Sequence, residues 1–275
     1  MTTGKVLDLS NYDYSTFSPE CFRNHGVKRA IVNSWDYGIS SDMLRKLRAV
    51  GIAVDDAYAF LYFGKPWEKR EVTNALRLHR EHKLKRIWLD VEARPPHEET
   101  WVTPEYRIRV VRDCVNMIRS EGVEPGIYTG RWYWVPYMNN TREFSSLKLW
   151  HSEYGRNDGT MSPVRYVDYG GWHRVSVHQY TSQLYLCGRN RDANYWYIEE
   201  DDMTKEDFIQ ALRNDKQFRD QVVSIIADEV PVHIELDPRK KSTWQRVLGI
   251  LGTGSDRMNV VIEKLKSIGR ELSTL

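Results

Sequence analysis

Two carboxylates one residue apart are the residues of this sequence that most directly suggest chemistry. Asp90 and Glu92 end the apolar run Ile87-Trp88-Leu89, which predicts a strand buried on both faces of a parallel sheet. Because residues i and i+2 of a strand point to the same side, the two carboxylates share one face. Two ionised carboxylates there would repel each other, so one is expected to keep its proton at a raised pKa. A carboxylic acid beside a carboxylate is the pair that glycoside hydrolysis requires.

The same short motif has plainer interpretations. Arg86 and Arg94 flank it, and either arginine could hold a carboxylate in a structural salt bridge. A carboxylate at the end of a strand can also cap the next helix. A three-residue motif does not decide between these alternatives. The catalytic interpretation therefore depends on which other residues gather at the same place.

Further polar and aromatic side chains stand at the ends of other predicted strands. In a barrel of alternating strands and helices the active site forms at the carboxyl ends of the strands. One polar residue at such an end means little, because it can cap a turn. Together with Asp90 and Glu92, however, two more carboxylates and three side chains able to contact sugar favour a site at this rim: Asp8, Tyr128, Trp150, Gln179 and Asp192.

The elements that would position these residues alternate between strand and helix. Apolar strand-like runs near residues 6–10, 30–32, 52–63, 87–91, 126–129 and 147–150 are separated by amphipathic helices, for which Ser18-Pro19, Ser41-Asp42 and Thr103-Pro104 are the predicted starts. Residues 175–180 alternate and predict a half-buried strand, and residues 191–196 close the region. The fold class is therefore α/β, an irregular TIM-like (β/α) barrel whose last strands lack regular helices.

Composition limits the kinds of partner. The net charge of +2 is close to balance and points neither to nucleic acid nor to an anionic membrane. The 10 Trp and 16 Tyr are a marked aromatic bias. Most of these rings fill a core, but aromatic faces also stack on sugar rings, so a carbohydrate groove fits the composition.

Cysteine usage and the start of the chain set expectations about compartment. Cys21, Cys114 and Cys187 are odd in number and far apart, which predicts neither a disulfide framework nor a metal cluster and suits a reducing compartment. The eight histidines show no ligand spacing, so no metal or cofactor is expected. The first residues lack the apolar segment of a secretory signal, and no run of 18 apolar residues follows. We therefore expect no leader, no membrane span and synthesis in a host cytoplasm.

Seven motifs in order make the region from Val6 to Trp196 resemble the family 25 glycoside hydrolases, the muramidases typified by phage and Chalaropsis-type lysozymes. No single motif is decisive, whereas their common order and spacing are specific. They are Leu7-Asp8-Leu9-Ser10, Ala57-Tyr58-Ala59-Phe60, Leu89-Asp90-Val91-Glu92, Pro125 to Gly130 followed by Tyr133-Trp134, Leu149-Trp150, Gln179 to Ser182, and Asp192-Ala193-Asn194.

The resemblance implies roles for these residues. Glu92 would be the general acid that protonates the leaving glycosidic oxygen, and Asp90 would orient the 2-acetamido group of the sugar. The nucleophile would then be the acetamido oxygen, although direct attack by a carboxylate stays an alternative. Asp8 and Asp192 would tune the pKa of Glu92 and bind sugar hydroxyls. The residues implied as lining the groove are Tyr58, Phe60, Tyr128, Trp150 and Gln179.

The sequence departs from the family pattern at several positions. Ala59 replaces the histidine often found on the third strand, and Asp55-Asp56 stands where small residues are usual. His178 takes the place of a tryptophan before Gln179, and Leu7 that of a glycine before Asp8. These changes affect the expected shape of the sugar subsites more than the chemistry, because all four carboxylates are present.

The composition changes near residue 200, which divides the chain into a predicted barrel, residues 1–200, and a mainly helical C-terminal region, residues 201–275. In the latter, Met258, Val261, Leu265, Ile268, Leu272 and Leu275 follow a heptad spacing. About two and a half heptads are too short for an isolated coiled coil. The segment is expected either to dock on the rest of the chain or to mediate a homo-oligomer or a contact with a phage tail protein.

The combined expectation is an enzyme, a lysozyme that cleaves the β-1,4 bond between N-acetylmuramic acid and N-acetylglucosamine in bacterial peptidoglycan. The expected absence of a leader favours a phage endolysin released through a holin, or a lysozyme carried on the virion tail. The alternative from another class is a non-catalytic wall-binding or tail structural protein that keeps the barrel. A metal-dependent barrel hydrolase is a second alternative, against which the lack of ligand clusters argues.

Overall fold

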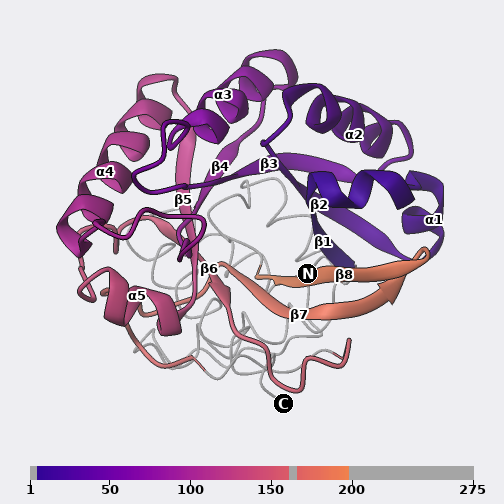
Figure 1. Ribbon diagram of the computed structural model, residues 1–275. Coiled ribbons are helices and arrows are strands. Elements are labelled where there is room, and N and C mark those ends of the chain that lie inside the picture. Colours follow the sequence, from indigo (N-terminus) through magenta and orange to yellow (C-terminus); the bar gives the residue numbers. More distant parts are fainter. Residues whose placement is uncertain (1–4, 161–165, 198–275) are drawn as a thin grey trace, which may run out of the picture. The chain divides into compact units, whose positions relative to one another are not determined.

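The computed structural model describes residues 5–160 and 166–197. Eight strands follow one another in chain order around a closed barrel, and five helices and a short 3-10 helix accompany them (Figure 1). The strands are β1 Lys5–Leu9, β2 Val27–Asn33, β3 Ala53–Phe60, β4 Arg86–Asp90, β5 Glu124–Thr129, β6 Lys148–Ser152, β7 Val177–Leu186 and β8 Arg189–Trp196. The helices are η1 Asn11–Thr16, α1 Pro19–Asn24, α2 Tyr37–Ala49, α3 Arg70–His82, α4 Pro104–Ser120 and α5 Arg131–Tyr137.

The direction of the last strand makes the barrel irregular. Strands β1 to β7 pair in parallel, whereas β8 pairs antiparallel with both β7 and β1 and closes the barrel. Within the described part of the chain no helix follows β6 or β7 (Figure 1). The predicted α/β barrel with irregular last strands is confirmed. The region beyond residue 200, with its predicted heptad helix and domain boundary, lies outside the described residues.

Side chains from seven different strands fill the interior of the barrel. Trp88 and Trp150 lie at its centre with their ring centroids 5.7 Å apart. Gly126, the β5 neighbour of Trp88, makes room for this ring, because a Cβ there would stand 2.4 Å from it. The other members of this interior cluster are Ile31, Tyr58, Tyr128, Val177 and Trp196.

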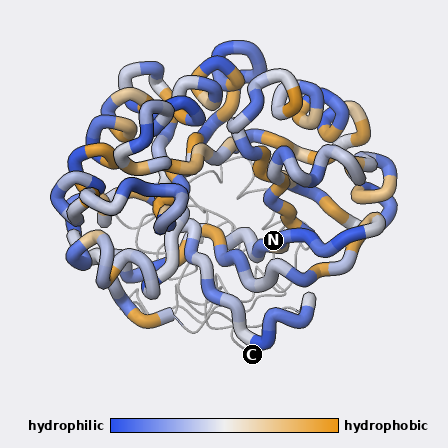
Figure 2. Tube along the Cα trace, in the orientation of Figure 1, coloured by the Kyte–Doolittle hydropathy of each residue, from blue (hydrophilic) through white to orange (hydrophobic). Residues whose placement is uncertain are grey.

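Two further apolar clusters lie between the strands and the helices outside them. Helices α3 and α4 cover one, to which Val72, Val111 and Ile118 contribute. Helix α2 covers the other, through Met43, Leu44 and Leu47. Figure 2 shows hydrophobic positions recurring along the first strands and on these helices, while the β7–β8 hairpin is largely pale or blue. The apolar stripes of the helices thus pack on the barrel wall, as amphipathic periodicity requires.

Helix α2 begins earlier than predicted. The predicted cap was Ser41-Asp42, but the helix starts at Tyr37, and the side chain of Asp36 caps it by accepting a hydrogen bond from the backbone N–H of Ile39 (3.1 Å). Asp36 is as good a cap as the predicted pair and stands closer to the end of β2. The predicted start of α4 is correct, since Thr103 accepts from the N–H of Tyr106 at 3.3 Å.

Strand β7 is buried more completely than its alternating pattern predicted. Its first five residues are all buried, including His178 and Tyr180. The loop after β6 packs on the outer face, where a helix would otherwise lie, and Asn157 there accepts hydrogen bonds from Thr181 and Ser182 (2.9 and 2.8 Å).

Cys21 and Cys187 form a disulfide that joins α1 to the turn between β7 and β8. The expectation that the cysteines form no disulfide is therefore wrong, and with it the argument for a reducing compartment. The two cysteines stand 166 residues apart, so only the closure of the barrel brings them together. Cys114 is free and buried. No helix among the described residues is long and apolar enough to cross a bilayer.

Candidate active site

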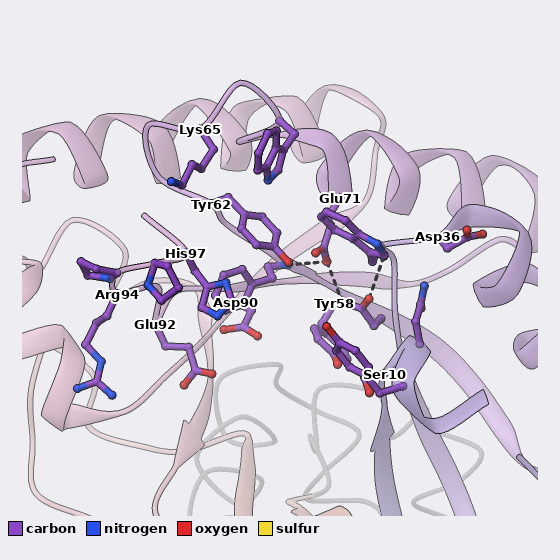
Figure 3. A pocket seen from close by; sticks show the side chains of 18 of the residues that line it. Ser10, Asp36, Tyr58, Tyr62, Lys65, Glu71, Asp90, Glu92, Arg94 and His97 are labelled. Carbon is purple, nitrogen blue, oxygen red and sulfur yellow. Dashed lines mark hydrogen bonds between the residues drawn. The ribbon is translucent and has the colours of Figure 1, made fainter. Parts of the chain in front are cut away.

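A groove of about 1270 Å³ opens beyond the carboxyl ends of β1 to β4. Asp90 and Glu92 lie in it with Tyr58 and Phe60, and aromatic and charged side chains from the following loops complete its walls (Figure 3). A smaller hollow of about 510 Å³ continues along the loops after β5 and β6. Glu92 and Trp132 line both hollows, so Glu92 stands where they meet.

Asp90, the last residue of β4, lies at the base of the groove and is only 6% exposed. Burial raises the pKa of its carboxyl well above the usual range, and the neighbouring carboxylates, first Glu92 and then Glu71, add to the effect. Its Oδ1 atom is buried and has no hydrogen-bond partner. An unsatisfied buried oxygen in a ligand groove marks a position where a donor from a bound molecule is expected.

Glu92 follows two residues later, as the alternation of the strand predicted. Burial raises the pKa of Glu92 to about 7, the charge of Asp8 contributes, and the guanidinium of Arg94 opposes the rise. Neither Glu92 nor Asp90 forms an ion pair with a described residue; Arg86 instead pairs with Asp56 and Glu124, and the guanidinium of Arg94 lies 4.8 Å from the ring centroid of Trp132. The salt-bridge interpretation of the motif therefore does not hold in the structure.

Asp8 and Asp192 meet across the β1–β8 pairing, where they are direct partners in register. The two carboxyls hydrogen-bond each other, which places a proton between them. Burial and the nearby Asp8 charge raise the pKa of Asp192 to about 8. Asp8 accepts further hydrogen bonds from Asn194 Nδ2 (2.7 Å) and Gln179 Nε2 (3.0 Å), which favour its charged form. Burial nevertheless raises the pKa of Asp8 to about 6, so Asp8 loses its proton before Asp192 and supplies the charge that acts on Glu92.

Three residues implied as groove-lining lie beneath it instead. Tyr128, Trp150 and Gln179 are at most 5% exposed and line neither hollow. Tyr128 donates its hydroxyl to Gln179 Oε1 (2.8 Å), and Trp150 donates Nε1–H to Asn194 Oδ1 (2.8 Å). Each therefore holds an amide that in turn hydrogen-bonds Asp8. Tyr58 and Phe60 line the groove as implied.

Sequence reasoning missed another buried acid in the groove. Glu71, in the first turn of α3, is 2% exposed, and burial raises its pKa to about 7. Its Oε2 accepts hydrogen bonds from Asn33 Nδ2 (2.8 Å) and the backbone N–H of Phe60 (2.9 Å). No strand-end rule could have found a helix residue. Asn33, in contrast, ends β2 and could have been found by the rule that found Asp90.

The aromatic walls of the groove were missed as well. Trp35 and Tyr62 come from the loops after β2 and β3, and Trp132 comes from α5. The signal was present, because Trp35 and Tyr62 follow strand ends closely. Its value was hidden by the number of aromatic residues in the chain, many of which are buried in the core.

The described residues contain one group that could ligate a metal, formed by Cys21, His25 and Cys187. Both of its thiols are joined in the disulfide, and none of the three residues lines the groove. The groove itself offers proton donors, proton acceptors and aromatic faces. It can therefore protonate a leaving group and hold a polar ring against an apolar wall.

Comparison with known proteins supports the resemblance found in the sequence. The family model for lysozyme-like protein 1 matches residues 6–180. A probable GH family 25 lysozyme 2 of Dictyostelium discoideum is 30% identical over 111 residues, which are 40% of this chain and 49% of that protein. The chain thus aligns with about half the length of this relative.

Solved structures share the fold. A family GH25 lysozyme from Aspergillus fumigatus superposes with a TM-score of 0.56 at 16% identity, covering 71% of this chain and 94% of the other. The modular Cpl-1 endolysin, in complex with a peptidoglycan analogue, superposes with a TM-score of 0.52 at 17% identity, covering 71% of this chain and 54% of its own.

Proposed function

Because the chain belongs to the family 25 glycoside hydrolases, we propose that it is a lysozyme that hydrolyses the β-1,4 bond between N-acetylmuramic acid and N-acetylglucosamine in bacterial peptidoglycan. The observation that carries this proposal is the position of Glu92. It is a carboxyl whose pKa burial raises to about 7, at the junction of two hollows in an aromatic-lined groove. A glycosidic bond at this junction would have one sugar in each hollow.

Glu92 supplies the proton. A carboxyl with a pKa near the working pH carries its proton often enough to donate it, and gives it up readily to the leaving oxygen. As the bond between C1 and the glycosidic oxygen breaks, that oxygen receives the proton of Glu92. The resulting carboxylate then accepts a proton from the water that completes hydrolysis.

Asp90 holds the 2-acetamido group of the sugar in the larger hollow, the only one of the two that it lines. Its unpartnered Oδ1 is a ready acceptor for the acetamido N–H. A hydrogen bond from that N–H to Asp90 orients the acetamido group and makes its carbonyl oxygen a better nucleophile for attack on C1. Direct attack by a carboxylate is the alternative course.

The bond cut is best tested by mass spectrometry of peptidoglycan fragments after digestion. The proposal expects fragments with N-acetylmuramic acid at the reducing end. Fragments that end in N-acetylglucosamine would indicate another glycosidase, and free stem peptides would indicate an amidase. Intact glycan after prolonged digestion would favour the non-catalytic wall-binding protein.

A second part of the proposal concerns the origin of the enzyme and the place where it acts. We infer a phage lysozyme, released through a holin or carried on a virion tail, that meets the cell wall outside the cytoplasm. The Cys21–Cys187 disulfide supports work in an oxidising setting. Co-expression with a holin in a bacterial host tests this origin, since the endolysin role expects lysis only when both proteins are present. A partner for the tail segment stays a prediction.

A further inference from the structure

One wall of the groove is a row of aromatic rings that face open space. Trp35, Tyr62 and Phe60 line it and are each only half-buried. The ring centroids of Trp35 and Tyr62 are 5.3 Å apart, and those of Tyr62 and Phe60 are 4.7 Å apart. Figure 3 places Arg94 and Glu92 at one end of the groove and Asp36, next to Trp35 in the chain, at the other. The wall therefore extends away from the proton donor.

Helix α3 holds the outer member of this wall from two sides. The guanidinium of Arg70 lies over the ring of Trp35, 4.5 Å from its centroid. Asn74, one turn later, donates Nδ2–H to the backbone carbonyl of Trp35 (2.9 Å). A tryptophan at the rim of a groove is thus fixed in both ring and backbone.

Glu71, between these two residues, fixes the rest of the wall. Its carboxylate accepts a hydrogen bond from the backbone N–H of Phe60 (2.9 Å), and the side chain of Tyr62 lies beside it (Figure 3), where its hydroxyl lowers the pKa of Glu71 by hydrogen bonding. It also accepts from Asn33, whose Oδ1 receives the backbone N–H of Trp35 at 2.9 Å. The Glu71 carboxylate is therefore linked to all three residues of the wall, and its link to Trp35 runs through Asn33.

This arrangement stabilises the fold less than a fully packed core would. Rings that face open space bury less apolar surface than core rings, and an acid buried beneath them without a salt bridge loses hydration. The faces left open are apolar planes, of the kind that stack on the C–H faces of sugar rings. A fixed plane binds better than a mobile one, because less freedom is lost when the ligand arrives.

We propose that Trp35 and Tyr62 form a distal sugar-binding subsite, and that Glu71 is the positioning residue that holds it. The proposal rests on the proposed function, because it places a second part of the same glycan on this wall. The wall runs from Phe60, the register partner of Asp90, outward to Trp35, so a short fragment bound at the bond to be cut is expected to leave the ring of Trp35 free. The subsite therefore makes the enzyme prefer long glycan chains.

Binding to a glycan ladder tests this without turnover. In a Glu92→Gln background, isothermal titration with N-acetylglucosamine–N-acetylmuramic acid oligosaccharides of two, four and six sugars should show affinity rising with length. Trp35→Ala should weaken binding of the longest member roughly fivefold to tenfold, the order expected for one aromatic contact, and leave the disaccharide unchanged. Trp101→Ala is the matched control, since Trp101 is 56% exposed but lines neither hollow.

Variants of the supporting residues separate positioning from folding. Tyr62→Phe removes the hydroxyl that Glu71 holds but keeps the ring, and should weaken only the long oligosaccharides, by less than Trp35→Ala. Glu71→Gln keeps the acceptor oxygen and should bind close to the parent, whereas Glu71→Ala should resemble Trp35→Ala. If Glu71→Ala does not fold, Tyr62→Phe decides the role of Glu71, and unchanged binding by it would contradict that role.

The result that overturns the subsite is an equal effect of Trp35→Ala on all lengths, or none. Failure of the proposed function has a different signature. In that case the wild-type chain releases no reducing ends from peptidoglycan, and the parent binds none of the three oligosaccharides.

Discussion

Buried carboxylates occur in two settings in this protein, and they differ in their partners. Away from the groove each has an arginine: Asp56 has Arg86 at 3.4 Å, Glu98 has Arg107 at 2.6 Å, and Asp13 has Arg191. At the groove and beneath it the acids have none, and within the described residues no salt bridge involves Asp8, Glu71, Asp90, Glu92 or Asp192.

The difference separates structural acids from chemical ones. An arginine opposes the effect of burial on its carboxylate, although burial still raises the pKa of Asp56 to about 6 beside Arg86. Where hydroxyls, amides and other carboxyls take the place of arginine, burial raises the pKa toward the pH at which the protein works. The acids at the groove, which have no arginine partner, stabilise the fold less and are better suited to transferring protons.

The substitution Glu92→Gln should have the largest effect among the tests of this distinction. The amide fits the same space but carries no proton to donate, so release of reducing ends from peptidoglycan should fall on the order of a thousandfold. Circular dichroism should show an unchanged fold. Glu121→Gln, at an exposed ion pair with Arg80, should keep full activity. A Glu92→Gln enzyme with more than a tenth of the parent rate would remove Glu92 from the mechanism.

Breaking an arginine-paired acid should have the opposite consequence. Arg107→Met leaves Glu98 buried without its cation and should lower the free energy of unfolding by about 3–5 kcal/mol in urea titrations. The folded fraction should keep its activity per molecule. Arg112→Met is the control, because its pair with Glu143 is largely exposed and should contribute about 1 kcal/mol or less. Equal losses from the two variants would show that burial does not distinguish the pairs.

The disulfide is expected to stabilise the fold without affecting the chemistry of the site, although it tethers the β7–β8 hairpin that carries Asp192. Replacing both Cys21 and Cys187 with serine should cost about 2–4 kcal/mol of unfolding free energy, since the bond closes a long loop in the unfolded chain. The pH profile of activity should not move. A shifted profile would mean that the bond also sets the environment of the Asp8–Asp192 pair.

The pH dependence of stability gives the smallest effect. A carboxyl with a raised pKa in the folded state binds its proton more tightly there than in the unfolded chain. Its contribution is therefore present at low pH and is lost as pH rises from about 4.5 to about 7 for Glu92. Over this window the wild type should lose on the order of 2 kcal/mol relative to Glu92→Gln. Activity should also fall above pH 7, as the donor loses its proton; parallel stability curves would contradict the raised pKa.

Much of this arrangement could be predicted from the sequence, for physical reasons. Period-2 alternation brought Asp90 and Glu92 to one face, and the strand-end rule placed Asp8 near them. The same rule did not show which strand-end residues sink below the rim, as Trp150 and Gln179 do, because that depends on how the barrel closes. Glu71 and the disulfide were missed since both join segments far apart in sequence, and no local pattern records such contacts.

The position of the last strand also has a consequence for biosynthesis. Asp8 lies on β1, yet its partners Asp192 and Asn194 come from β8, which is synthesised last among the eight strands of the barrel. Until β8 is inserted between β7 and β1, the barrel stays open along one seam and the proton shared by the two aspartates has no fixed place. A nascent chain without β8 therefore lacks the Asp8–Asp192 pair, which forms in a single late step of assembly.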